Sequence, residues 1–269
     1  MNRLNLNRLV QILLVWIASV DVVRSEMASI KSSMDTTIFN NPNFASNPLS
    51  NGMGQHMFAG RTGGNNTFEL RRALLAFDIA GEIPANAIID TASLQLTVSK
   101  APHDSADPFA LYRVLASWGE GNSDAEAPEG VGTGAQPGDA TWTHRLFPNV
   151  FWNSQGGDFD ASPSATKDIH DIGTYVFFST KLATDVQYWV DNPSENYGWF
   201  LLGNEQGVMN ARRFFTRESG NDDGVPTLRV TFHVIPEAST SGLMGIGVGV
   251  VLWLRRGKTV PVHERRPGV

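Results

Sequence analysis

The feature that most constrains the fold is a short run, residues 71–79, that is apolar on both faces when read as a strand. With a period of two, its apolar side chains fall on one face at Leu75, Phe77 and Ile79 and on the other at Leu74 and Ala76. The run is too short for a stand-alone helix, and turn-forming Gly, Asn and Pro residues lie on both sides of it. Because a strand that is apolar on both faces lies inside a packed sheet, we expect residues 71–79 to form the central strand of an all-β sandwich.

The rest of residues 35–234 predicts more short strands and one short helix. Residues 92–99 alternate between apolar and polar side chains, as in a half-buried strand. Apolar residues between 182 and 190 recur at helical spacing and end at Asn192-Pro193. The other expected strands are 35–39, 57–59, 109–114, 175–179 (a buried type), 199–202, 212–217 and 228–232. Their number and the turns between them favour a jelly-roll-like β-sandwich.

Residues 121–139 interrupt this pattern with a long stretch rich in Gly, Ala, Glu and Pro. The stretch has too little apolar surface to fold alone, which predicts a mobile surface loop.

Composition excludes several classes of site. The chain contains no cysteine, so disulfides, cysteine-ligated zinc and a thiol nucleophile are ruled out. Residues 26–240 carry 13 basic and 25 acidic side chains, a net charge of −12. We therefore expect no nucleic-acid partner, because such partners require a basic surface.

Residues 1–25 have the pattern of a secretory signal peptide. Arg3 and Arg8 precede an apolar stretch. The side chains at the cleavage position after it are small or are of a kind accepted at signal-peptide cleavage sites. We place the cut between Ser25 and Glu26 and expect residues 26–34 to be a disordered start. The alternative is an N-terminal membrane anchor, but the apolar stretch is shorter than the roughly 20 residues that span a bilayer.

The C-terminal region combines a short polar motif, a Gly-rich apolar segment and basic residues. Pro236-Glu237-Ala238 opens residues 235–258, and a basic tail, residues 259–269, follows. The arrangement resembles the PEP-CTERM sorting signal of Gram-negative bacteria, with Ala238 in place of the last proline. The resemblance implies a transient membrane helix and cleavage by an exosortase-like enzyme near Pro236 and Glu237. It also implies delivery to the cell envelope, cell surface or extracellular matrix. A permanent C-terminal membrane anchor is the alternative.

Several short segments of the body together resemble the DNRLRE-domain family of exported bacterial proteins. In chain order they are residues 50–52, 58–60, 71–78, 83–84, 111–114, 118–121, 140–142, 156–159, 198–203, 213–218 and 226–228. The resemblance covers most of residues 35–234 and implies a β-sandwich. Some related domains are attached to polysaccharide-degrading enzymes as carbohydrate-binding modules, which suggests polysaccharide as a partner.

Basic side chains concentrate at two places in the otherwise acidic body. The candidate ligand-binding residues there are Arg71, Arg72, Arg212, Arg213, Arg217 and Glu218. Arginine forks could bind the carboxylates of uronic acids or sugar hydroxyls, with Arg72, Arg213 and Arg217 as the preferred contacts. The structural alternative is that they pair with Asp78, Glu205 and Glu218 on neighbouring strands.

Two tryptophans that lie next to loops, Trp142 and Trp152, are candidates for a sugar-stacking platform. The alternative is that both belong to the core, because large aromatic side chains dominate burial in β-sandwiches.

The sequence contains no recognisable catalytic or metal motif. Nucleophile-elbow and phosphate-loop patterns are absent, so we expect no enzymatic activity and no cofactor. The acidic and histidine residues at 168–171 do not have metal-ligand spacing, so a solvated turn is favoured. Asp222, Asp223 and the Asn- and Asp-rich loops could hold a structural calcium ion.

These observations predict an exported, non-catalytic surface or matrix protein that binds polysaccharide. The alternatives are a purely structural matrix or biofilm protein and an accessory of a polysaccharide lyase or hydrolase.

Overall fold

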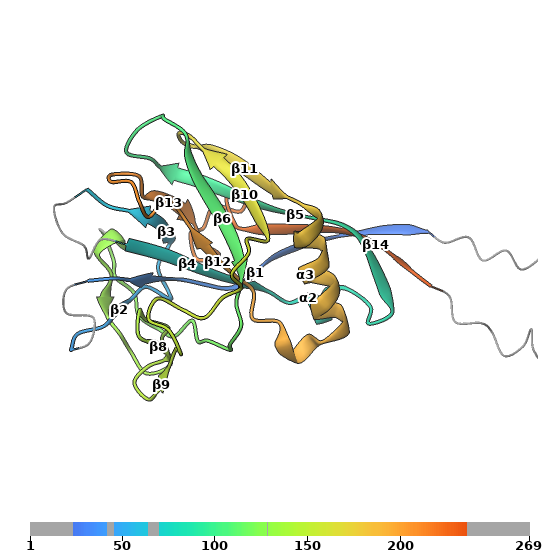
Figure 1. Ribbon diagram of the computed structural model, residues 1–269, viewed down its shortest axis with the longest axis horizontal. Coiled ribbons are helices and arrows are strands. Elements are labelled where there is room, and N and C mark those ends of the chain that lie inside the picture. The colour runs from blue at the N-terminus through green and yellow to red at the C-terminus, as the bar shows by residue number, and fades with distance from the viewer. Residues whose placement is uncertain (1–23, 42–45, 64–69, 128, 236–269) are drawn as a thin grey trace, which may run out of the picture. The chain divides into compact units, whose positions relative to one another are not determined.

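The computed structural model describes residues 24–41, 46–63, 70–127 and 129–235. Within this part of the chain, Arg24–Val234 builds two packed antiparallel sheets with few helices, which confirms the predicted all-β sandwich (Figure 1). The predicted C-terminal segments, residues 259–269 and nearly all of 235–258, lie outside the described residues, as do residues 1–23.

The first sheet, sheet A, is centred on β5 (Ala87–Lys100). One edge of β5 pairs with β11 (Gly173–Phe178), and the other pairs first with β14 (Thr227–Val234) and then with β13 (Arg212–Phe215). The predicted alternation in residues 92–99 is confirmed, since Ala92, Leu94, Leu96 and Val98 are buried.

The second sheet, sheet B, is centred on β4 (Leu70–Phe77), the strand predicted from the two-sided apolar run. From β4 the strand order of sheet B runs through β12 (Trp199–Leu202) and β6 (Asp107–Arg113) to β10 (Ala165–Ile169). One face of β4 packs into the core between the sheets through Leu75 and Phe77. The other face packs through Leu74 into a second apolar cluster outside sheet B, which explains why β4 is apolar on both faces.

Two strands pass from one sheet to the other and join them. β1 (Ser25–Phe39) pairs with β14 up to Lys31 and with β4 from Ser32 onward, and its register with β4 shifts between Ser32 and Met34. β3 (His56–Arg61) pairs with β13 and then, from Gly60, with β4. Gly60 has φ +108°, and a Cβ there would lie 2.9 Å from the Ala211 backbone, so this crossing requires glycine.

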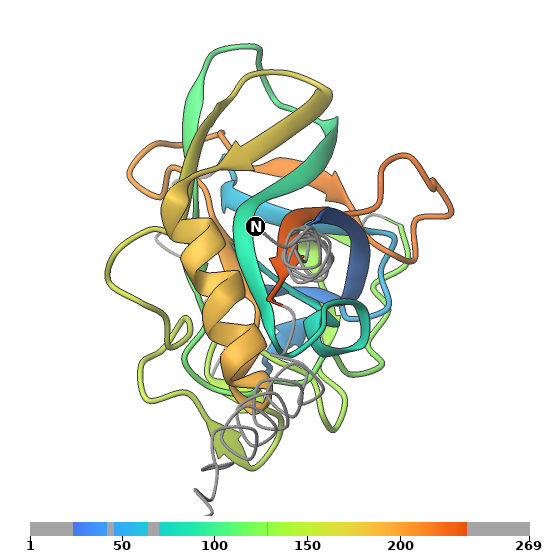
Figure 2. The same cartoon turned by 90° about the vertical axis from the view of Figure 1, so that its right-hand side faces the viewer.

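The predicted helix is confirmed as α3 (Thr180–Asp191), which lies beside β5 (Figure 2). Ser179 caps its N-terminus by accepting from the Leu182 amide at 2.9 Å. The stripe Leu182, Val186 and Trp189 packs into the core between the sheets.

The smaller elements lie in the connections. They are β2 (Leu49–Ser50) paired with β7 (Thr133–Gly134), β8 (His144–Leu146) paired with β9 (Val150–Phe151), α2 (Ile79–Glu82), and the 3-10 turns Glu129–Val131 and Pro193–Glu195. The predicted strand 71–79 is two residues too long, because Ile79 begins α2 and the Asp78 carboxylate caps this helix by accepting from the Gly81 amide at 3.0 Å.

The prediction of a disordered start at residues 26–34 is wrong. These residues belong to β1, whose backbone pairs with β14, and Ile30 lies in the core at 4% exposure. Among its apolar side chains only Ile30 is fully buried and Met27 is 75% exposed, so its order comes largely from backbone pairing with the distant strand β14. The predicted cleavage bond between Ser25 and Glu26 falls at the start of this strand.

The prediction of a mobile loop at residues 121–139 is also wrong for the part that is described. Asp139 is fully buried and its carboxylate accepts from the amides of Asn122 and Gln136, at 3.0 and 2.6 Å. Gly121 lies so close that a Cβ would be 1.5 Å from this carboxylate. A buried acceptor therefore organises a segment that has little apolar surface.

The expectation that residues 175–179 form a buried-type strand is wrong for one of its two faces. β11 lies at the edge of sheet A and pairs only with β5 among the described strands. Phe177 is buried, whereas Val176 and Phe178 on the other face are exposed.

Candidate functional site

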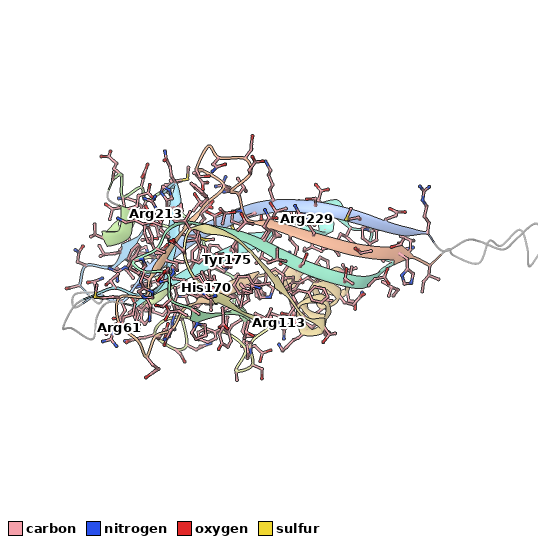
Figure 3. The ribbon with its side chains drawn as sticks, turned by 90° about the horizontal axis from the view of Figure 1, so that it is seen from above. Arg61, Arg113, His170, Tyr175, Arg213 and Arg229 are labelled. Atoms are coloured by element: carbon pink, nitrogen blue, oxygen red, sulfur yellow. The ribbon has the colours of Figure 1, made fainter. Side chains whose placement is uncertain are left out.

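The predicted basic residues do not form one cluster. Arg72 lies on the outer face of sheet B, because its neighbours Ala73 and Leu75 face the core between the sheets. Arg213 is on the outer face of sheet A, since the adjacent Phe214 faces the core. Figure 3 labels Arg213 among the side chains. A single polysaccharide could not contact both residues in the way the sequence suggested.

Arg72 is held by protein groups on every side. Its Nε and Nη2 donate to the Glu205 carboxylate at 2.7 and 2.9 Å, and its Nη1 donates to the Gly156 carbonyl at 2.6 Å. The guanidinium also lies 4.7 Å from the centre of the Trp142 ring. The fork that was expected to bind a uronic acid is thus already bound by Glu205.

The two tryptophans proposed as a stacking platform are buried. Trp142 and Trp152 are 6% and 5% exposed and belong to the apolar cluster outside sheet B. Trp152 donates Nε1 to the Thr141 carbonyl at 2.9 Å. The platform prediction is corrected, because neither ring presents a free face to a sugar.

Arg212 is also buried and cannot contact a polymer in this structure. Its side chain is 0% exposed and donates to Asp107 and to the His170 carbonyl. Figure 3 places His170 next to Tyr175, whose hydroxyl accepts from the His170 amide at 3.1 Å. Arg71 donates to the Gly130 carbonyl at 3.1 Å and lies over the Phe39 ring.

Arg213 bonds to a neighbouring strand, and Asp78, one of the acidic residues expected to pair with an arginine, caps a helix. Arg213 Nε donates to the Ser99 hydroxyl at 2.9 Å, on the neighbouring strand β5. Asp78 caps α2 and does not pair with an arginine in the contacts seen here. Of the three expected acidic partners, Glu205 and Glu218 do pair with arginines.

A cluster that the sequence did not predict brings together Asp35, Glu120, Glu218 and Arg217. Asp35 comes from β1, Glu120 from the start of the 121–139 segment, and the other two follow β13. Arg217 donates Nε and Nη2 to the two oxygens of Glu120 at 3.1 and 2.6 Å. Its Nη2 also lies 2.8 Å from the Glu218 carboxylate. We call these four residues the carboxylate cluster.

Asp35 is the innermost member of the carboxylate cluster and is fully buried. Its Oδ2 accepts from the Ser32 hydroxyl at 2.8 Å and from the Arg217 amide at 3.1 Å. Burial, and next the nearby charge of Glu218, raise the pKa of Asp35 to about 7. Burial likewise raises the pKa of Glu218. Three carboxylates and one arginine leave this site with an excess of negative charge.

The sequence assigned no site role to Asp35 or Glu120. The available signal was the position of Asp35 directly before the apolar strand residues Thr36 to Phe39. A charged residue at the head of a buried strand needs a partner, but apart from Ser32 the groups that contact Asp35 are 85 or more residues away.

A shallow groove runs along the outer face of sheet B. It encloses about 360 Å³ and is lined by Pro108, Phe109, Ala110, Tyr112, Thr166, Leu202, Gly203, Asn204 and Glu205. The residues come from β6, β10, β12 and the segment after β12. Its lining combines apolar and aromatic groups with the polar side chains of Thr166, Asn204 and Glu205, and Glu205 is the residue that Arg72 holds.

A second hollow, of about 530 Å³, is entirely different in chemistry. It is lined by Asn122, Ser123, Asp124, Thr133, Gln136 and Pro137, all from the 121–139 segment. It offers polar groups and a proline but no aromatic ring.

The sites considered for metals in the sequence are not assembled. Asp168 lies on β10, and His170 and Asp171 lie in the following turn. Asp222 pairs with Lys31 at 2.8 Å. Among residues 24–41, 46–63, 70–127 and 129–235, the group with metal-ligand geometry is Asp35, Glu120 and Glu218.

No protein-family model and no curated protein matches the chain. None of the helices in the described residues is both long and apolar enough to cross a membrane.

Proposed function

We propose that the protein is an exported, non-catalytic surface or matrix protein that binds polysaccharide in the groove on sheet B. The observation that carries the proposal is the lining of that groove. Sugars present apolar C–H faces and many hydroxyls, and they bind where an aromatic ring and a few polar groups converge. Tyr112 supplies the ring, and Thr166, Asn204 and Glu205 supply the polar groups.

The charge of the groove favours neutral polysaccharides. Glu205 brings a carboxylate to the rim, and its partner Arg72 is fully engaged by Glu205 and Gly156. A uronic-acid polymer would meet this carboxylate and an acidic body, whereas a neutral polymer can donate hydroxyls to it. The arginine fork thus acts as a positioning residue for Glu205.

The proposed location rests on the two chain ends, with their signal-peptide pattern and resemblance to PEP-CTERM. Mass spectrometry of the native protein from medium and envelope fractions tests it. We expect a chain that starts at Glu26 and ends near Pro236 and Glu237. An intact C-terminus in the membrane fraction would instead indicate a permanent anchor.

The binding test uses the purified full-length chain and a panel of polymers. Affinity electrophoresis against a neutral glucan, a neutral mannan, alginate and pectin should show retardation by a neutral polymer. Tyr112→Ala should weaken this binding about tenfold, the loss expected for one stacking ring. Phe178→Ala is the matched control, because Phe178 is an exposed aromatic residue on β11 outside the groove.

Other results would count against the proposal in different ways. Unchanged binding of the Tyr112→Ala variant would exclude the groove as the site. Failure of every polymer to bind would favour a purely structural matrix protein. Release of reducing ends from any polymer would favour the lyase or hydrolase alternative.

A further inference from the structure

The carboxylate cluster contains buried oxygens without hydrogen-bond partners. They are Asp35 Oδ1 and Glu218 Oε2, both shielded from solvent, whereas Glu218 Oε1 lies 2.8 Å from Arg217 Nη2. Asp35 itself is 0% exposed. Buried polar atoms are normally paired, and an orphaned carboxylate oxygen is more costly than a neutral acceptor. Two such atoms among three carboxylates point to a further positively charged group at this place.

The geometry of these groups matches that of a metal site. Asp35, Glu120 and Glu218 each offer an oxygen, and these oxygens all lie within 4.8 Å of one another. Arg217 contributes one positive charge against three carboxylates, so a divalent cation would make the site neutral. Together these observations provide ligand atoms, unsatisfied acceptors and a matching charge.

We propose that Asp35, Glu120 and Glu218 bind a calcium ion. Carboxylate oxygens are the ligands that hard cations prefer, and no histidine or thiol takes part. Calcium takes about six to eight oxygen ligands in a flexible shell, whereas magnesium requires a near-ideal octahedron and keeps several waters. The three carboxylates offer up to six oxygens from three separate segments, which favours calcium.

The ion would connect three segments that are distant in the sequence. Asp35 lies where β1 has just entered sheet B, Glu120 opens the 121–139 segment, and Glu218 begins the loop between β13 and β14. Calcium therefore fixes two surface segments to the sandwich. Glu120 Oε1 already accepts from the Asp35 amide at 2.7 Å, which orients it toward the site.

A shared proton is the competing explanation for the same geometry. One proton between Asp35 and Glu218 would also relieve their repulsion and would satisfy two oxygens. It differs from calcium in its consequence, because a site filled by a proton does not respond to calcium.

The test is calcium titration of the metal-free, full-length protein by isothermal calorimetry and thermal unfolding. We expect one calcium bound per chain and a midpoint that rises about 5–10 °C when calcium exceeds its Kd about 100-fold. Asp35→Asn and Glu218→Gln should each weaken binding at least tenfold. If Asp35→Asn fails to fold, Glu218→Gln still tests the site, because Glu218 lies in a loop.

The matched control is Asp222→Asn, which removes an exposed carboxylate from the same loop region. It should bind calcium as the parent chain does. Absence of calcium binding at millimolar concentration overturns the proposal in favour of the shared proton. Binding that survives in both cluster variants overturns the assignment to these residues, and stabilisation by magnesium alone overturns the choice of calcium.

Discussion

Arg212 and Asp107 form an ion pair inside the protein: Nη2 lies 3.1 Å from Oδ2, and the arginine side chain is 0% exposed. The guanidinium also donates to the carbonyls of His170, Asn210 and Ser105 at 2.8, 2.9 and 3.0 Å. It thereby joins the start of β13 to the start of β6 and to the turn after β10. A residue that the sequence suggests as a ligand contact is a buried structural connector.

Arg212→Ala should destabilise the protein by about 3–5 kcal/mol, because it leaves Asp107 buried without its partner. Arg212→Lys should also destabilise it, since an ammonium cannot reproduce the planar fork. Urea unfolding measures both effects. Arg229→Ala is the control: Arg229 is exposed and donates to Gln95, so its loss should cost within about 0.5 kcal/mol. A loss below about 1 kcal/mol for Arg212→Ala would contradict the structural role.

Asp35 should make the metal-free protein less stable as pH rises from about 4 to 7. Its pKa is raised from 3.8 to about 7 by burial and by Glu218, so in this window the folded chain holds a proton that the unfolded chain has lost. The stability lost across the window is about 4 kcal/mol. Arg217 and Glu120 also face the group, and their opposing effects are included in that pKa.

The pH effect is measured by urea unfolding at several pH values in metal-free buffer. Asp35→Asn should flatten the profile between pH 4 and 7, because asparagine does not titrate. A variant with the same slope as the parent chain would show that other groups cause the pH dependence.

Asp139→Ala should loosen the 121–139 segment. The change removes the acceptor for the amides of Asn122, Ser123 and Gln136, and charge-assisted hydrogen bonds of this kind contribute about 1.5–3 kcal/mol each. We expect faster hydrogen exchange at these amides and faster proteolysis within the segment.

Two further variants make the test of the segment specific. Asp139→Asn keeps one carbonyl oxygen and should restore part of the protection. Asp124→Ala removes an exposed carboxylate that accepts only from the Glu126 amide among the contacts seen here, and should have little effect. Unchanged exchange in Asp139→Ala would mean that other contacts order the segment.

Arg72→Ala and Arg213→Ala should differ in their effect on polysaccharide binding. Arg72 holds Glu205 at the rim of the groove, whereas Arg213 lies on the other sheet and bonds to Ser99. We expect Arg72→Ala to weaken binding severalfold and Arg213→Ala to leave it unchanged, as measured by affinity electrophoresis. Equal losses in the two variants would contradict the assignment of the groove.

The strands with strong patterns could be predicted from the sequence. In β4 the two-sided apolar run indicated a central strand, and in β5 the alternation indicated which side chains face the core. The spacing of Leu182, Val186 and Trp189 indicated α3. In each case the signal is the period of side chains within one segment, which depends only on local geometry.

Order that depends on distant partners could not be predicted in this way. The first half of β1 fully buries only Ile30 among its apolar side chains and is held largely by backbone pairing to β14. The 121–139 segment is held by the buried carboxylate of Asp139 and by hydrogen bonds with Asn51 and Arg71, and these acceptors and donors meet only once the chain has folded.

The sequence by itself determined the fold class, the central strand and the one long helix of the sandwich, because these follow from periodic burial. The tertiary structure alone decided which charged residues meet. Arg72 pairs with Glu205, 133 residues away, and Arg217 pairs with Glu120, 97 residues away. Asp35 lies in a site with two other carboxylates. Such pairs depend on how strands are placed side by side, and no short-range pattern in the sequence records that placement.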